Sequence, residues 1–285
     1  MAMGAANVIP GVSGGTVAFI TGIYERLIHA LKHVDIAALK LIAKGDFEGF
    51  AKRVDLSFLL FVFLGVFVSI LSLAKLLEFA FERYETLTLS FFFGLILASI
   101  LAVSRQIERW DVGVIIAFIL GTVLAIAIAF LPPAMPNDSF LYIFLCGIVA
   151  VCSMILPGLS GSYILLLMGN YLLVLNAVST FNFAILVPLF LGCVVGLISL
   201  SRLLSYLFKH FKDQTIGILS GFVAGSLLII WPWKHTVTES FDGKEKAIGY
   251  SWLFPSIDST FFLALSLVIL GFFLVLWMEK SAKKN

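Results

Sequence analysis

Apolar residues form long segments along this chain, and short polar or charged stretches separate them. Several segments are about 20 residues long, the length of helix that crosses a hydrocarbon layer about 30 Å thick. They lack the alternation of apolar and polar residues that is typical of a membrane β-strand. The pattern therefore predicts six spanning helices, at residues 57–80, 87–104, 111–131, 184–208, 214–231 and 259–278.

Composition supports this interpretation. Of the 285 residues, 61% are hydrophobic and 13% are charged, and the mean hydropathy is +1.08. Soluble domains are about half apolar and a quarter charged. We therefore expect an all-α integral membrane protein with a single membrane domain. No basic residue precedes Arg26, so no removable signal peptide is expected.

Two further apolar segments, residues 1–31 and 140–178, are broken by a repeated motif. The first copy is Ile9–Gly15 (IPGVSGG), and the second, 147 residues later, is Leu156–Ser162 (LPGLSGS). Such Pro-Gly breaks cannot be regular helix, and at membrane depth they survive only where protein or a wet cavity surrounds them. Each segment is predicted to be a re-entrant hairpin. The first arm, about nine residues or roughly 13 Å of helix, is too short to span.

A second register of repetition relates the spans themselves. Ser72–Leu77 matches Ser199–Leu204, and Gly94 matches Gly221, in each case with an offset of 127 residues. The chain is thus predicted to consist of two related halves, each a broken hairpin followed by three spans. Because three is odd, the second half should enter the membrane inverted, as in many secondary transporters. The alternative is a duplication kept for packing alone.

The predicted halves have the following boundaries. The first, residues 1–138, contains the hairpin 1–31, an amphipathic connector at 32–56 and the first three spans; the second, residues 139–285, contains the hairpin 140–178 and the last three.

Charge indicates the orientation. The stretches 32–56, 105–110 and 209–213 and the tail from 279 hold twelve of the 19 basic residues, and the opposite loops hold four. Basic loops stay in the cytoplasm. We therefore expect a multi-pass membrane protein with a cytoplasmic C-terminus. A net charge of +2 gives no indication of a nucleic-acid partner.

The two motif loops are the candidate substrate site. Glycine-rich backbone that leads into a helix offers N–H donors to an oxyanion, and serine or threonine hydroxyls add further donors. An anionic oxygen group is the expected ligand, and a simple hinge is the alternative. The candidate residues are Pro10, Gly11, Ser13, Gly14, Gly15, Thr16, Pro157, Gly158, Ser160, Gly161 and Ser162.

Two cations occupy equivalent positions in the repeated spans, Lys75 and Arg202. They are candidates for steering or coordinating the anion; the alternative is that each side chain extends to nearby lipid headgroups. Lys75 has Glu78 one helical turn away, which favours a local ion pair. The planar guanidinium of Arg202 is better suited to phosphate.

Other residue patterns predict packing rather than chemistry. Cys146, Cys152 and Cys193 are isolated, and the histidines lie near segment ends, so neither a disulfide nor a metal site nor a cofactor is expected. The stripe Gly217, Gly221 and Gly225, with Ser90, Gly94 and Ala98 in the first half, indicates close helix packing, either within one chain or between two.

With these motifs, the chain resembles the bacterial polyprenyl-phosphate transporter family of PopT type. The resemblance covers nearly the whole chain and is carried by Ala2–Thr16, Ile155–Ser162, Gly225-Ser226 and Trp231-Pro232-Trp233. It implies a flippase for undecaprenyl phosphate, a lipid with a phosphate head and a long prenyl tail. By this resemblance, undecaprenyl phosphate, the carrier lipid, would return from the outer to the inner leaflet of the bacterial cytoplasmic (inner) membrane for cell-envelope (peptidoglycan) synthesis.

The resemblance implies a transporter and not an enzyme, and it assigns the substrate to the motif residues above with Arg202 as the cation. Members of the family often carry a basic residue before the Trp-Pro-Trp, but this chain has Leu227–Ile230 there, so no phosphate contact is placed on that segment. A transporter or channel for a small inorganic anion is the main alternative. A membrane lipid phosphatase is a weaker one, because neither loop contains Asp, Glu or His.

Overall fold

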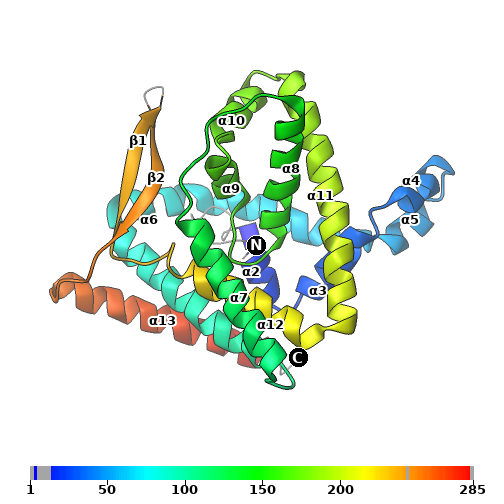
Figure 1. Cartoon of the computed structure of the whole chain (residues 1–285). Coiled ribbons are helices and arrows are strands. Elements are labelled where there is room, and N and C mark those ends of the chain that lie inside the picture. Colours follow the sequence, from blue (N-terminus) through cyan, green and yellow to red (C-terminus); the bar gives the residue numbers. More distant parts are fainter. Residues whose placement is uncertain (1–2, 5–13, 242–243, 283–285) are drawn as a thin grey trace.

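A computed structural model describes residues 3–4, 14–241 and 244–282. Its helices and strands are arranged as in Figure 1. Their bounds are α2 Gly14–Ile20, α3 Tyr24–Lys32, α4 Ile36–Ala43, α5 Phe47–Arg53, α6 Leu56–Ser104, α7 Val112–Ala129, α8 Phe140–Ile155, α9 Gly161–Leu167, α10 Tyr171–Ser179, α11 Phe183–His210, α12 Lys212–Ser226, β1 Lys234–Phe241, β2 Lys244–Trp252 and α13 Ser259–Ala282.

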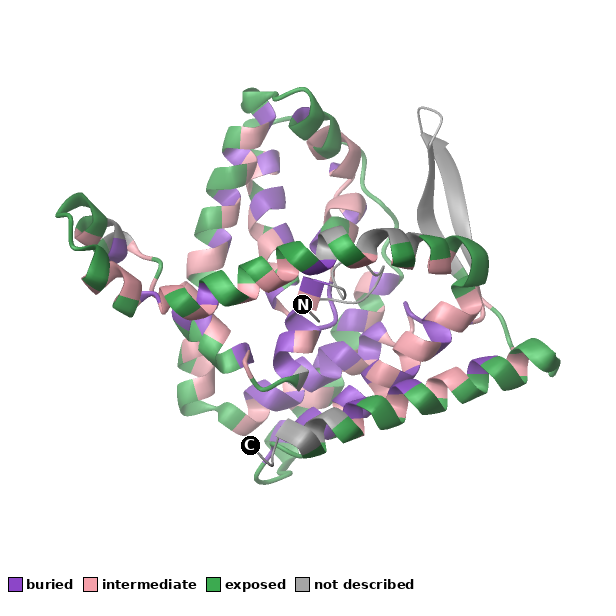
Figure 2. Cartoon of the chain, turned by 180° about the vertical axis from the view of Figure 1, so that it is seen from behind, coloured by how far each residue is buried: buried purple, intermediate pink, exposed green. Residues whose placement is uncertain are grey.

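The predicted all-α membrane protein is confirmed at this level. Among the described residues, four helices are long and apolar enough to cross a membrane, and the bent pair α9–α10 would be a fifth span if counted as one. Figure 2 shows buried residues gathered at the centre and exposed residues along the outer faces of the long helices. Many of the exposed residues are large and apolar, such as Phe61 on α6 and Phe273 on α13. These faces suit contact with lipid.

The helix α6 contains two of the predicted spans, joined at a sharp bend. The bend lies at Tyr84, whose φ of −142° and ψ of 45° are not helical. The Thr88 hydroxyl donates to the carbonyl oxygen of Ala80 at 3.1 Å, although eight residues of straight helix would separate them by about 12 Å. The chain therefore turns back here, and Figure 1 shows the two arms of α6 diverging from the turn.

Two pairs of helices, α7 with α12 and α6 with α13, approach each other through glycines. A Cβ atom on Gly221 of α12 would collide with the Phe118 carbonyl oxygen of α7, and one on Gly121 of α7 would collide with Ile218 of α12. In the second pair, Gly94 faces the Val268 carbonyl in the same way. The predicted close packing of the small-residue stripe is thus found within one chain, where backbones can come into van der Waals contact.

Each motif leads into a short helix that ends at a glycine corner. The helices α2 and α9 have seven residues each, or about 10 Å, which is too short to cross a membrane. Gly22 (φ 72°) follows α2 and Gly169 (φ 74°) follows α9. At the second corner the axes of α9 and α10 differ by 115°.

The predicted connector at 32–56 forms two short helices that project from the body (Figure 1). Asp35 caps α4 by accepting a hydrogen bond from the Ala38 amide at 3.0 Å. Asp46 caps α5 in the same way, by accepting one from the Gly49 amide at 2.8 Å. Arg53 pairs with Asp35 at 2.7 Å and holds the pKa of that carboxyl at about 2. These local bonds explain why so polar a stretch is helical outside the apolar body.

The sequence analysis missed a β-hairpin between α12 and α13. Strand β1 pairs antiparallel with β2. Two indole groups hold its base to the end of α12: Trp252 donates to the Leu228 carbonyl at 2.8 Å, and Trp231 donates to Leu253 at 3.1 Å. The Trp-Pro-Trp segment therefore helps to fasten the hairpin.

Replacing Gly221 with alanine tests the packing of α12 on α7. The added methyl group would meet backbone, which cannot move aside, so we expect a loss of about 1–3 kcal/mol and a clearly lower melting temperature in detergent. Gly217→Ala is the matched control, because its Cβ would lie 3.0 Å from the Val114 oxygen and requires a smaller adjustment. Equal melting temperatures for the two variants would contradict this account.

Candidate functional site

The two motif regions, far apart in the sequence, meet directly. The backbone N–H of Gly158, in the second motif, donates to the Thr16 hydroxyl oxygen at 2.8 Å, and both residues are buried. Thr16 lies in the first turn of α2, just after the first motif. The hydrogen bond satisfies an amide of an irregular loop that would otherwise be unpaired in an apolar environment.

A second contact joins the same regions. Tyr24, at the start of α3, is 1% exposed and donates its hydroxyl to the carbonyl oxygen of Ile155 at 3.1 Å. Ile155 is the last residue of α8, where helical carbonyls have no partner within the helix. The Tyr24 ring packs edge-on against Phe19 and Phe208. The sequence analysis did not place Tyr24 at the site, because nothing in a lone tyrosine indicates a partner 131 residues away.

The second loop is folded tightly against α12. Gly158 has φ of 85°, and a Cβ there would lie 2.6 Å from the Phe222 carbonyl oxygen, so only glycine fits. Pro157, Gly158 and Gly161 are buried. Ser160 is half-buried and Ser162 exposed, and their hydroxyl oxygens lie 2.9 Å apart. The loop thus presents hydroxyls on one side and rests on α12 with the other.

Only part of the first loop can be placed. Gly14 and Gly15 open α2 and are buried beside Thr16. Pro10, Gly11 and Ser13 lie outside the described residues.

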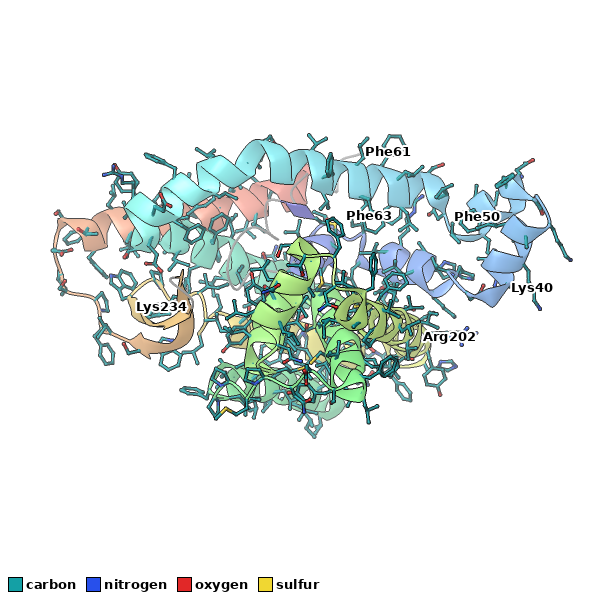
Figure 3. The ribbon with its side chains drawn as sticks, turned by 90° about the horizontal axis from the view of Figure 1, so that it is seen from above. Lys40, Phe50, Phe61, Phe63, Arg202 and Lys234 are labelled. Carbon is teal, nitrogen blue, oxygen red and sulfur yellow. The ribbon has the colours of Figure 1, made fainter. Side chains whose placement is uncertain are left out.

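The two cations predicted for the site are not brought to it. Arg202 is exposed on α11 and its side chain points away from the body in Figure 3. One turn further on, Ser205 accepts a hydrogen bond from the Lys32 ammonium at 3.0 Å. The side chain of Lys75 lies outside the described part of the chain.

Comparison with known proteins decides the family. The model of the undecaprenyl phosphate translocase-like family matches residues 3–248. The chain belongs to this family. It is 40% identical to a polyprenyl-phosphate transporter of Vibrio cholerae over 293 aligned residues, covering 100% of this chain and 95% of the relative. It is 26% identical to a polyprenyl-phosphate transporter of Staphylococcus aureus, over 81% of this chain and 83% of the relative. No solved structure matches it significantly.

In this translocase-like chain, a cation that the sequence analysis overlooked lies near Leu227–Ile230, where no basic residue occurs. Lys234 follows the Trp-Pro-Trp directly and folds back, so that its ammonium donates to the Ile229 carbonyl. Burial lowers the pKa of Lys234 to about 8, and the charge of nearby Glu85 partly opposes this. Proximity in sequence to the Trp-Pro-Trp was the available signal, but the fold-back depends on the turn at 227–230.

Hydrogen bonds fix the corner of the second hairpin, at Gly169, to the segment 134–137. The Ala134 amide donates to the Leu167 carbonyl at 2.7 Å, and the buried Asn170 side chain exchanges two hydrogen bonds with the backbone of Asn137, at 2.7 and 2.9 Å. A cavity of about 820 Å³ lies beside these hydrogen bonds and is bordered by Tyr171 and Asn176. At the corresponding corner of the first hairpin, no described atom lies within 4 Å of where a Cβ of Gly22 would be.

Within the described residues, no group of three or more His, Cys, Asp or Glu side chains could hold a metal ion. The chemistry available at the loop junction is therefore that of backbone amides and hydroxyls.

Thr16→Val tests the junction of the loops. Valine keeps the shape but leaves the buried Gly158 amide without its acceptor, so we expect a loss of about 1–3 kcal/mol in stability. Thr16→Ser keeps the acceptor and should therefore retain most of the stability of the natural chain. The melting temperatures of both variants, measured in the same detergent, check this; a Thr16→Ser variant as unstable as Thr16→Val would contradict it.

The lowered pKa of Lys234 predicts a pH effect. Burial disfavours the charged form in the folded protein, so the unfolded chain binds the proton more tightly. Stability should therefore rise as pH increases from about 8 towards the ordinary lysine value near 10.4. The melting temperature of the natural chain should rise across this range relative to that of Lys234→Met. Parallel pH profiles for the two proteins would refute the prediction.

Proposed function

We propose that this protein moves undecaprenyl phosphate from the outer to the inner leaflet of the bacterial cytoplasmic membrane, for carrier recycling in peptidoglycan synthesis. The observation that carries the proposal is the junction of two Pro-Gly-x-Ser-Gly regions inside an apolar helical protein, joined by the hydrogen bond from Gly158 to Thr16. The relatives named polyprenyl-phosphate transporters make a lipid phosphate the substrate of choice.

The proposed architecture is a pair of inverted repeats, residues 1–138 and 139–285. Two features of the fold support it. The third span of each half, α7 or α13, packs through glycine on the second span of the other half, α12 or the second arm of α6. The short helices after the two motifs end at glycines with nearly the same φ, Gly22 and Gly169. Each glycine-packed pair takes one helix from each half, so movement of the pair α7–α12 against the pair α6–α13 would expose the junction to each side in turn.

The proposed site must replace the water around a phosphate. An ion at membrane depth costs several kcal/mol unless it is paired or hydrogen-bonded. The helices α2 and α9 have seven residues each, so their dipoles contribute little, and loop amides and hydroxyls supply most of the donors. The contacts proposed are those of Pro10, Gly11, Ser13, Gly14, Gly15 and Thr16 with Pro157, Gly158, Ser160, Gly161 and Ser162.

Cations at the periphery are proposed to guide the phosphate. Lys234 and Arg202 lie on opposite sides of the molecule (Figure 3). In the proposed orientation, which follows the charge bias of the loops, Lys234 lies at the outer face and Arg202 near the cytoplasmic end of α11. Lys234 would then attract the headgroup on entry, and Arg202, with Lys75 at the related position, would assist elsewhere on the path. The prenyl tail would stay in lipid along the exposed apolar faces.

Movement without bond breaking is the proposed reaction. A phosphatase needs a nucleophile beside a general acid or base. Ser160 and Ser162 have each other as hydrogen-bond partners, and no carboxylate or imidazole bonds to either of them among the described contacts. The proposal is therefore a transporter with no cofactor and no metal.

Transport in proteoliposomes tests the proposal. The natural chain should speed the transbilayer movement of a fluorescent polyprenyl phosphate, and combining Ser13→Ala with Ser160→Ala should slow it at least tenfold because two donors to a charged group are removed. Ser179→Ala is the matched control, because its hydroxyl bonds to the Asn176 carbonyl of its own helix. If labelled chloride or inorganic phosphate crosses and the lipid does not, the protein is a small-anion transporter instead.

A further inference from the structure

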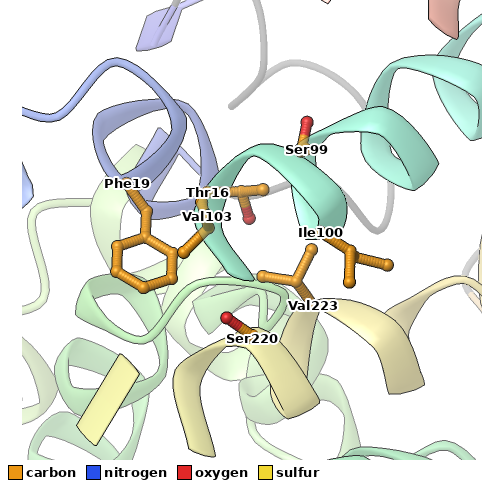
Figure 4. Close-up of a pocket in the computed structure, with 7 residues that line it drawn as sticks. All are labelled: Thr16, Phe19, Ser99, Ile100, Val103, Ser220 and Val223. Atoms are coloured by element: carbon orange, nitrogen blue, oxygen red, sulfur yellow. The ribbon is translucent and has the colours of Figure 1, made fainter. Parts of the chain in front are cut away.

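A narrow seam lies where α2 meets the second arm of α6 and α12 (Figure 4). Three hydroxyl residues line it, one from each of these helices: Thr16, Ser99 and Ser220. The rest of its lining is apolar and includes Phe19, Val103 and Val223. The seam therefore gathers hydroxyl groups from both halves of the chain in otherwise apolar surroundings.

Both motif regions border this seam. Thr16 lines it and accepts the hydrogen bond of Gly158. Gly158 also packs on α12 beside the seam, because a Cβ on it would lie 3.1 Å from the Cα of Val223. The seam is thus the space on the α6 and α12 side of the loop junction.

The hydroxyl of Ser220 has no hydrogen-bond partner among the described residues, although the residue is fully buried. Helical serines commonly bond to a carbonyl one turn back, as Ser99 does to Leu95. Figure 4 shows the Ser220 hydroxyl directed into the seam. A buried donor without a partner is rare and requires an explanation.

The surroundings of Ser220 restrict what could bond to it. The seam is too narrow for a water molecule in this conformation, and none of the described residues that line it is charged. A group that enters when the helices separate would meet the hydroxyls of Thr16 and Ser220, whereas the Ser99 hydroxyl is bonded to the Leu95 carbonyl of its own helix. Such a group must accept several hydrogen bonds and bring its own charge, as a phosphate does.

We propose that Ser220, together with Thr16, donates hydrogen bonds to the terminal phosphate when it occupies the middle of the pathway. This inference rests on the proposed function and assigns the phosphate one contact, Ser220, outside the repeated motifs. The narrowness of the seam selects a lipid monophosphate, because a diphosphate or a sugar-bearing head would have to separate the helices much further. Neutral donors hold the phosphate without trapping it.

Binding of farnesyl phosphate to the purified full chain in nanodiscs tests the inference. Ser220→Ala should weaken the affinity about tenfold, since one hydrogen bond to a charged group is lost. Its melting temperature should be unchanged or higher, because the removed hydroxyl has no partner in the folded protein. Farnesyl diphosphate should bind the natural chain at least tenfold more weakly than the monophosphate.

Ser201→Ala is the matched control. Ser201 is also a fully buried serine, but its hydroxyl bonds to the Ile198 carbonyl of its own helix, α11. This variant should bind farnesyl phosphate as the natural chain does.

The outcomes separate the two proposals. If the natural chain moves polyprenyl phosphate but Ser220→Ala binds farnesyl phosphate with unchanged affinity, the proposed role of Ser220 is wrong. The proposed transport function would not be affected. A natural chain that neither binds nor moves the lipid would overturn both.

Discussion

The structure depends on one constraint: backbone polar groups at membrane depth must find partners within the protein. Pro-Gly motifs interrupt the apolar sequence twice, and such breaks leave amides and carbonyls that lipid cannot satisfy. Thr16 accepts from the Gly158 amide, and Tyr24 donates to the Ile155 carbonyl at the end of α8. Because each of these bonds joins the two motif regions, the breaks stabilise one another, and neither region could be folded alone in the same way.

The same constraint shapes how a phosphate would be handled. The described junction offers amides and hydroxyls, while Arg202 and Lys234 lie far apart at the periphery. A charge pair in the apolar centre would bind strongly and release slowly, since electrostatic attraction grows as the local dielectric falls. A neutral centre with cations near the two ends instead favours passage. The glycine-mediated packing of α12 on α7 and of α13 on α6 holds the two helices of each pair in close contact.

Much of this could be predicted from the sequence, because apolar segment length is a strong signal. The predicted spans at 111–131, 184–208 and 259–278 lie within a few residues of α7, α11 and α13. The motif repeat likewise marked where both short helices begin. What escaped depends on contacts distant in sequence or on backbone turns. The Tyr24 bond, the fold-back of Lys234 and the exposed site of Arg202 are set by tertiary packing, which no local pattern encodes. The β-hairpin was missed because its polar strands carry no clear hydrophobic alternation.

Gly22 and Gly169 occupy matching positions of the repeat, yet they are held by different restraints. Both adopt positive φ, which disfavours any other residue by strain in the backbone. At Gly169 the Ala134 carbonyl also fills the place of a side chain, whereas the described surroundings of Gly22 are open. One copy is therefore restricted by conformation alone and the other by conformation and space. The first corner can therefore accept asparagine, which tolerates a positive φ better than most residues, whereas the second corner requires glycine.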